Sequence, residues 1–450
     1  MTRFRVTAAA ILSAAALLAA ATAAGPLARS AGAERSELSA SDLAFIGGVI
    51  ELVEHNYVHS VGASELTKDA LKGMLARLDP HSDYMDEEEF KQSQGSITGR
   101  FGGLGMEISQ QAGLPKVISP IDGTPAARAG LQPGDLILSI DRQSTHGMDL
   151  TKVVTLLRGD PGTSVTLNIS RGETPPFDVT LKREIIHVQS VKSRLEPNDI
   201  GYVRITEFAG DTGKQFRSTI DDLQHRASGG RLKGLVLDLR NDPGGLLTAA
   251  VEVAGNLLDG GGVVSIRGRR PGDEQAYTAP AKGDMLPGTP VVVLVNGASA
   301  SASEIVAGAL QDRHRATVMG TQSFGKGSVQ SIIPLKGHGA LRLTTALYYT
   351  PSGRSIQDEG IAPDIVVEAP KDVQIAGGVL LRESELHGAI TNPGSLGPKT
   401  HASAGKRTDD QKDARSAPIK TELIGTPQDG QLKAALADIQ KRLGATNQPG

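Results

Sequence analysis

The strongest constraint on the fold is the run 291–295, in which five consecutive aliphatic residues precede a turn of small residues. A short apolar run bounded by turn residues is typical of a strand that is buried on both faces. After the turn, the sequence up to Leu310 has a helical pattern. The sequence therefore predicts a strand, a tight turn and a helix, with Ser301 where the helix begins.

Layered α/β structure is predicted for much of the chain. From 187 to 370, apolar strand candidates alternate with helical stretches. Residues 41–90 have helical periodicity, and 96–186 consist of short β-like runs interrupted by glycine. At 450 residues the chain exceeds the size of one hydrophobic core, so we expect a multi-domain α/β protein. The predicted boundaries are 1–24, 37–92, 96–186, 187–370 and 371–450.

The C-terminal region combines a polar segment with an amphipathic end. After Leu386 the sequence is rich in Gly, Pro, Ser and Lys to about 427, which is typical of a disordered linker. Such a linker leaves the apolar stripe of the last helix to be covered either by the chain's own core or by a second subunit. We expect this helix and 41–90 to contribute to a homodimer contact. The stripe consists of Leu432, Ala435, Leu436, Ile439 and Leu443.

The N-terminus has the features of an export signal. Arg3 and Arg5 precede an alanine-rich apolar stretch, 6–24, that ends in small residues. An uncleaved membrane anchor is the alternative, because this stretch approaches the length of a bilayer span. The absence of Cys excludes disulfides and thiol catalysis. We therefore expect a periplasmic protein and leave its association with the inner membrane open.

Composition argues against nucleic acid as a partner. Aromatic residues make up 3% of the chain and Trp is absent, so a stacking platform for single strands is not expected. The formal net charge of −3 provides no basic footprint for a polyanion.

Ser301 has two interpretations. With Glu304 it has the spacing of a capping box, which satisfies free amides at a helix start and needs no catalytic role. Alternatively, its hydroxyl is a nucleophile at a strand end, near the positive end of a helix dipole and among small neighbours that leave room for a substrate. A nucleophile needs a base, and His314 is the nearest histidine but lies in a plain polar turn.

Lys326 is the better candidate for that base. It lies between two glycines and before an apolar strand that would bury it, and Gln330, four residues on, could hold its amine. To act near neutral pH, the amine needs a pKa of about 7–8 instead of about 10.4, a shift that burial can produce. The same segment nearly matches a phosphate-binding P-loop. However, Gly327 stands where magnesium needs Ser or Thr, and a strand follows instead of a helix.

Paired glycines mark a third candidate site. Gly244 and Gly245 follow a predicted strand at 235–239 and precede a helical stretch. The plain interpretation is an ordinary strand-to-helix turn. The functional interpretation is an oxyanion hole formed by the amide of Gly245, with that of Gly244 as the alternative, together with the amide of Ala302.

These sites lie in sequence blocks that resemble the carboxy-terminal processing proteases, peptidase family S41. The blocks are Ser-Ala-Ser-Ala-Ser-Glu around Ser301, Phe-Gly-Lys-Gly around Lys326, and further motifs within 348–364. The resemblance extends from about 41 to 390. It implies a core like the crotonase and Clp-protease β/α superhelix, with Ser301 as nucleophile, Lys326 as general base and Gln330 as the residue that positions the lysine.

A second group of motifs resembles a PDZ domain inserted before this core. Residues 101–108 are similar to the carboxylate-binding loop, and 123–137 are similar to the central turn, helix and strand. Consecutive amides at Leu104, Gly105 and Met106 would bind a chain-terminal carboxylate while the peptide adds to a strand edge.

The resemblance implies a serine endopeptidase that processes or degrades periplasmic proteins without a metal or organic cofactor. Its expected partners are proteins or peptides with free apolar C-termini, and an adaptor is left open. A catalytically silent PDZ scaffold or chaperone is the alternative, against which the intact Ser301–Lys326 pair argues. A metalloprotease is disfavoured because His55 and His59 lack the accompanying Glu. One departure from the family pattern near the core site is Asp242, where Asn is common.

Overall fold

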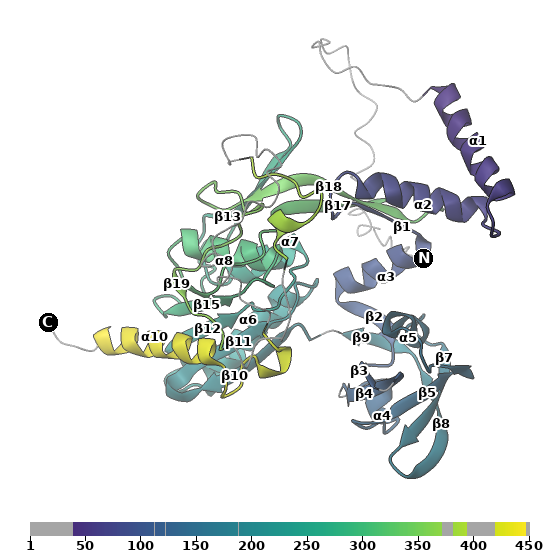
Figure 1. The fold of residues 1–450 in the computed structure, drawn as a ribbon. Coiled ribbons are helices and arrows are strands. Elements are labelled where there is room, and N and C mark those ends of the chain that lie inside the picture. Colours follow the sequence, from purple (N-terminus) through teal and green to yellow (C-terminus); the bar gives the residue numbers. More distant parts are fainter. Residues whose placement is uncertain are drawn as a thin grey trace, which may run out of the picture. The chain divides into compact units, whose positions relative to one another are not determined.

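The computed structural model describes residues 39–111, 113–121, 123–187, 189–370, 381–393 and 419–446 (Figure 1). The predicted export signal at 1–24 lies outside them. None of the described helices is long and apolar enough to cross a membrane. The chain divides into a small unit, residues 1–67, and a large unit, residues 68–450.

Helix α1 (Ala40–Asn56) of the small unit begins where the sequence predicts helical structure. The Ser39 side chain accepts the Asp42 amide in a capping box, which explains the start of the helix. Along α1, which is fully described, no residue is buried, and Phe45 is 71% exposed. The chain continues through α2 (Ala63–Ala76), which runs from the small unit into the large one.

Residues 100–187 form a β-rich module with its own hydrophobic core. Strand β2 pairs with β9, and a second sheet has the order β3-β4-β5-β7-β8, with β6 paired to β5. Aliphatic side chains on one face of the strands, such as Val117, Ile137 and Leu167, form this core. Helix α5 contributes Val153 and Leu157 to it. The elements are β2 (Arg100–Gly103), β3 (Met106–Gln111), β4 (Leu114–Pro120), α4 (Pro125–Arg128), β5 (Leu136–Ile140), β6 (Gln143–Ser144), α5 (Leu150–Leu157), β7 (Ser164–Arg171), β8 (Thr174–Lys182) and β9 (Glu184–His187).

The α/β core of the large unit is built on a mostly parallel sheet. Its order is β10-β11-β12-β15-β16-β19, in which β10 runs antiparallel to β11 and the other neighbours are parallel. The strands predicted at 235–239 and 291–295 are present among its central strands. The central strands are β11 (Ile200–Ile205), β12 (Gly234–Asp238), β15 (Val291–Val295) and β16 (Thr317–Gly320), flanked by β10 (Val191–Glu196) and β19 (Ile365–Val366).

Successive residues of the central strands face two different layers. Leu237 and Val293 lie in the core that contains helices α6 (Thr212–Arg226), α7 (Leu247–Gly255) and α8 (Ala302–Asp312). Val236 and Val292 lie in the core that contains helix α10 (Gly430–Thr446). Because side chains alternate across a strand, burial on both faces explains why these strands are apolar without alternation.

The terminal helix α10 packs on the chain's own sheet. Leu432, Ala435 and Ile439 are buried against a cluster that includes Tyr202 and Leu294. The expectation that this stripe contributes to a dimer contact is therefore wrong. The surface that covers it belongs to strands far away in the sequence, which local patterns cannot reveal.

A second sheet and the C-terminal segments complete the large unit. The sheet has the order β1-β18-β13-β14 with β17 paired to β18, and β1 was not predicted. Of the predicted linker, 394–418 lies outside the described residues. Its described ends bury Asn392 and Ile419, so these ends are not a linker, although their composition suggests one. The elements are β1 (Asp83–Met85), α3 (Glu87–Thr98), β13 (Gly262–Gly268), β14 (Glu274–Thr278), β17 (Ser328–Pro334) and β18 (Ala340–Tyr349).

Truncating Ile439 to Ala tests the packing of α10. Its side chain is buried, so we expect a loss of about 2–4 kcal/mol in the free energy of unfolding, measured by urea denaturation. Replacing the exposed Gln440 of the same helix by Ala serves as the control and should change stability little. A wild-type unfolding curve for Ile439→Ala would contradict this packing.

Candidate active site

Ser301 lies in a strained turn between β15 and α8. It is the N-cap residue of α8, with φ of 55° and ψ of −111°, and its side chain remains 8% exposed. A residue other than glycine at positive φ costs of order 1–3 kcal/mol and persists where the surroundings enforce it. A strained strand-to-helix turn is the geometry that projects a nucleophilic hydroxyl out of a sheet.

The Glu304 carboxylate joins the Ser301 turn to the Lys326 loop. Its Oε2 accepts the amides of Ser301 at 2.8 Å and Lys326 at 2.9 Å, while Oε1 accepts the Gly325 amide at 2.7 Å and the Ser323 hydroxyl at 2.6 Å. Burial raises its pKa to about 7 against the effect of these hydrogen bonds. The capping half of this role was visible in the sequence, but the link to Lys326 was not.

The Lys326 side chain is half-buried beside charged groups of both signs. Burial lowers the pKa of the amine below its ordinary value; the nearby Glu383, Glu304 and Asp79 carboxylates oppose this shift and Arg342 adds to it. Among the described residues, the amine makes no hydrogen bond to the Ser301 hydroxyl. It lines a cavity of about 310 Å³ together with Ala76, Asp79, Pro80, His81, Ser82, Asp83 and Arg342.

Gln330 lies on β17 but does not contact the Lys326 amine in the described structure. A bulge between Val329 and Gln330 shifts its register. Its amide instead donates to Ser328 Oγ at 3.0 Å and Thr344 Oγ1 at 3.4 Å. Because the Thr344 hydroxyl donates to Asp79 Oδ1 at 3.0 Å, Gln330 reaches the Lys326 cavity indirectly.

A buried network on the other side of Lys326 was missed by sequence reasoning. Glu383 lies 2.8 Å from His81 Nε2 and accepts the Gln357 side-chain amide at 3.0 Å. The Gln357 oxygen in turn accepts the Gly327 amide at 3.0 Å. Three segments that are distant in the sequence therefore enclose Lys326, and no local motif could have indicated their meeting.

The paired glycines lie against the Ser301 turn. A Cβ atom on Gly244 would lie 2.8 Å from Ser301 Cβ, and one on Gly245 would lie 2.3 Å from the Phe208 carbonyl oxygen, so larger residues do not fit. The Gly244 amide donates to Asp242 Oδ1 at 2.8 Å. The amides of Gly245 and Ala302 have no acceptor among the described residues. This difference favours the Gly245 amide over that of Gly244 as an oxyanion donor.

Asp242 is fully buried at the base of this turn. Burial raises its pKa well above the ordinary value, and its Oδ2 has no hydrogen-bond partner among the described residues. A protonated carboxyl group presents an acceptor and a donor, as an Asn side chain does. A protonated Asp242 could therefore take the place of the Asn that the family resemblance leads us to expect at this position.

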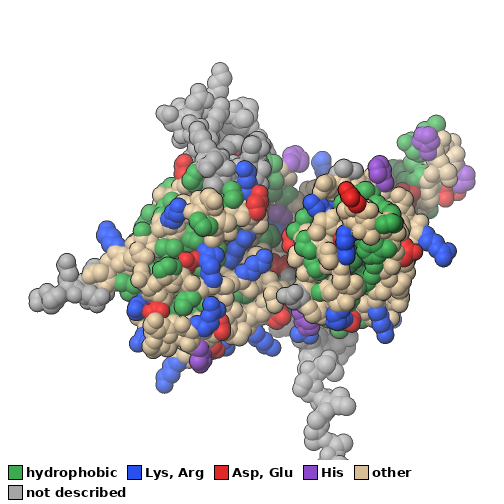
Figure 2. Space-filling view, turned by 90° about the horizontal axis from the view of Figure 1, so that it is seen from below, with side chains coloured by type: hydrophobic (Ala, Val, Ile, Leu, Met, Phe, Trp, Pro, Cys, Tyr) green, Lys and Arg blue, Asp and Glu red, His purple; other side chains and the backbone are tan. Residues whose placement is uncertain are grey.

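The three residues expected to bind a carboxylate line one pocket of the β-rich module. Leu104, Gly105 and Met106 border a cavity of about 230 Å³ whose walls are mostly aliphatic, including Val154 and Leu157. Figure 2 shows hydrophobic side chains gathered on one face of this module. An apolar cavity beside a glycine turn suits the last side chain of a peptide.

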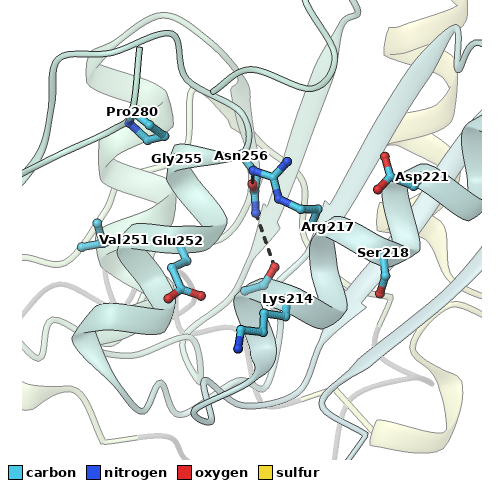
Figure 3. A pocket seen from close by; sticks show the side chains of 10 residues that line it. Lys214, Arg217, Ser218, Asp221, Val251, Glu252, Gly255, Asn256 and Pro280 are labelled. Carbon is cyan, nitrogen blue, oxygen red and sulfur yellow. Dashed lines mark hydrogen bonds between the residues drawn. The ribbon is translucent and has the colours of Figure 1, made fainter. Parts of the chain in front are cut away.

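A larger pocket of about 470 Å³ lies between α6 and α7 and includes none of the predicted site residues (Figure 3). The Asn256 side chain lies in this pocket. Its Oδ1 accepts a hydrogen bond from the Arg217 guanidinium at 2.5 Å, and its Nδ2 donates one to the Gly213 carbonyl oxygen at 3.4 Å. The wall of the pocket contains both Lys214 and Glu252. Because the two charges are of opposite sign, the lining favours neither an anionic nor a cationic ligand. We assign it no function.

Known protein families and individual relatives match most of the chain. Residues 199–367 match peptidase family S41, 116–171 a PDZ domain, and 7–89 the N-terminal domain of the activating protease CtpB. A carboxy-terminal-processing protease of Bartonella bacilliformis is 50% identical over 366 residues, 81% of this chain and 84% of that one. The carboxy-terminal processing protease CtpA of Bacillus subtilis is 34% identical, covering 71% and 68%. The solved photosystem II D1 C-terminal processing protease is 30% identical, covering 73% and 93%, with a TM-score of 0.42.

Replacing Glu304 by Gln tests its role as a bridge. The substitution keeps the shape but turns an NH₂ group toward buried donors, so we expect a loss of about 1–3 kcal/mol in unfolding free energy at pH 8. The same change at the exposed Glu359 is the control. Equal urea midpoints for the two variants would show that the four hydrogen bonds of Glu304 contribute nothing.

Proposed function

Because the chain belongs to the carboxy-terminal processing proteases of peptidase family S41, we propose that it is a serine endopeptidase with Ser301 as nucleophile and Lys326 as general base. One observation carries this proposal. The amides of Ser301 and Lys326 bond to the same oxygen of Glu304, so their main chains are fixed about two hydrogen-bond lengths apart. A purely structural cap would need no glycine-flanked lysine at this position.

The proposed reaction is acyl transfer from the substrate to Ser301 and then to water. The neutral Lys326 amine accepts the hydroxyl proton as Ser301 Oγ attacks the peptide carbonyl, and the resulting ammonium protonates the leaving amine. The amides of Gly245 and Ala302 bind the oxyanion, for which their free N–H groups are suited. A water molecule activated by Lys326 then cleaves the ester and restores both side chains.

The position of the Lys326 amine sets a requirement on this reaction. The amine lies in the cavity with Asp79, and no described hydrogen bond joins it to Ser301. We propose that its side chain turns toward Ser301 when a substrate binds, while its backbone amide stays on Glu304. Leaving the neighbouring carboxylates would also remove the charges that oppose the lowering of its pKa.

Substrate choice is proposed to rest on the PDZ domain. Its apolar cavity favours proteins with free apolar C-termini, and the chain-terminal carboxylate would bind the amides of Leu104, Gly105 and Met106. The predicted export signal at 1–24 supports the proposal that these substrates are periplasmic. A homodimer and an adaptor protein stay predictions from the sequence.

Replacing Ser301 and Lys326 separately by Ala tests the dyad. Each change should lower hydrolysis of a quenched fluorescent peptide by orders of magnitude, whereas a mere cap at Ser301 would cost about 0.5–2 kcal/mol of stability and leave turnover intact. Lys336→Ala, at an exposed position, and His314→Ala are the controls. Full activity in Lys326→Ala with loss in His314→Ala would overturn the assignment, and equal turnover in wild type and Ser301→Ala would favour the silent scaffold.

The pH dependence of turnover provides a separate test of the base. Only the neutral amine can accept a proton, so kcat should rise with pH through the pKa of Lys326 and then level off. Burial lowers that pKa, so the midpoint should lie below 10.5. A histidine base would instead level off above about 6.5. A profile that falls as pH rises through this range would contradict a lysine base.

Binding of paired peptides tests the PDZ domain. A peptide with an apolar last residue should bind with a Kd between micromolar and millimolar, and its C-terminally amidated twin should lose most of this affinity because an amide carries no negative charge. Calorimetric titration of the Ser301→Ala variant avoids cleavage during the measurement. Equal affinities would exclude recognition of the carboxylate.

A further inference from the structure

A buried ion cluster lies directly before the glycine turn. Arg240 is fully buried, and its guanidinium donates to Asp238 at 2.9 and 2.5 Å and to Asp429 at 2.9 and 2.6 Å. It also donates to Gln431 Oε1 at 2.9 Å. Asp238 ends β12, while Asp429 and Gln431 lie at the start of α10. The cluster therefore ties the end of β12 to a segment almost 200 residues later in the chain.

The next residue makes a second tie to the same C-terminal segment. Asn241 donates its side-chain amide to the Ile419 carbonyl at 2.8 Å and to Thr421 Oγ1 at 3.3 Å. Asn241 is also bonded to Asn296. The backbone N–H of Asn241 donates to Asn296 Oδ1 at 3.0 Å, and the side-chain Nδ2 of Asn296 donates to Asn241 Oδ1 at 2.7 Å. Asn241 is thus held between the turn that precedes Ser301 and residues 419–421.

The backbone held in this way does not have a relaxed conformation. Asn241 has φ of 56°, and Gly244 and Gly245 have φ of 99° and 141°. Glycine adopts such angles readily, whereas a residue with a Cβ atom, such as Asn241, keeps a positive φ mainly where surrounding contacts determine it. The contacts on one side of this turn come from the nucleophile turn, and those on the other side come from residues 419–431.

We propose that residues 419–431 position the oxyanion-binding turn, with Asp429 acting on the Gly245 amide through Arg240. This inference rests on the proposed function, since it assumes that Gly245 and Ala302 bind the oxyanion. The C-terminal segment is then part of the catalytic apparatus of this chain without touching the substrate, and Asp429 is a positioning residue.

The charge of Asp429 is central to this role. Burial by itself would raise its pKa, but hydrogen bonds and the charge of Arg240 lower it below the ordinary value, as do the amides of Gly425 and Leu432. Asp429 is therefore ionised at neutral pH. In Asp429→Asn the guanidinium remains paired with Asp238, but it loses the charge-assisted bonds that hold its other edge, and we expect Arg240 to shift. A shift of Arg240 moves the adjoining turn, because the two are consecutive in the chain.

Kinetics of the full-length Asp429→Asn variant test the proposal. An oxyanion exists only in the transition state, so a displaced Gly245 amide should lower kcat by about tenfold or more and leave KM within about twofold. The control is Ile439→Val, which weakens the packing of the same helix on the sheet without touching Arg240. It should keep kcat within twofold of the wild type. Both are measured on one quenched fluorescent peptide, with Ser301→Ala as the blank.

Two results would overturn the proposal. One is a wild-type kcat in Asp429→Asn, and the other is an equal fall of kcat in Ile439→Val, which would mean that general loosening of the helix is responsible. If Asp429→Asn does not fold, Thr421→Val replaces it. This variant removes the hydrogen bond that Thr421 accepts from Asn241, so it should lower kcat severalfold and leave KM unchanged. A wild-type kcat in Thr421→Val would also overturn the proposal. Failure of the proposed function is recognised separately, since Ser301→Ala would then hydrolyse the peptide as fast as the wild type.

Discussion

The arrangement of the active site depends on one buried carboxylate. Glu304 binds the Ser301 amide at the start of its own helix and the amides of Gly325 and Lys326 in the loop after β16. An ionised carboxylate can accept several hydrogen bonds, and in a dry interior each of them is strong because water does not compete. A shorter side chain would not reach both loops. The position of the proposed base relative to the proposed nucleophile therefore follows from this group.

The parallel sheet determines which loops can meet at that carboxylate. Strands β12, β15 and β16 are parallel neighbours, so the turns that follow their carboxyl ends emerge at the same edge of the sheet. These turns carry the paired glycines, Ser301 and Lys326. Helices on one face and α10 on the other bury both sides of these strands. The C-terminal helix therefore contributes both to the stability of the core and, through Arg240, to the geometry of the site.

Lys326 shows how opposing electrostatic effects are balanced. Burial and Arg342 favour the neutral amine, whereas the Asp79 and Glu383 carboxylates favour the ammonium form. The carboxylates themselves accept hydrogen bonds from neutral donors, among them Ser82 for Asp79 and Gln357 for Glu383. A base whose protonation depends on which groups surround it responds to small movements of its side chain. The cavity around Lys326 is thus part of its chemistry.

The sequence by itself determined the central strands of the fold and the candidate residues Ser301 and Lys326, although it indicated neither β1 nor the network around Glu383. Aliphatic runs such as 291–295 specify strands that are buried on both faces, and small residues before Ser301 specify the turn, because both signals are local. Asp242, Glu304 and Lys326 were visible as residues, but their environments were not. Tertiary structure alone decided that Glu304 links two loops, that Glu383 and His81 enclose the base, and that α10 covers its own sheet instead of a second subunit. The physical reason is that hydrogen bonding and burial depend on distances in space, and here the partners come from segments that local sequence patterns treat as independent.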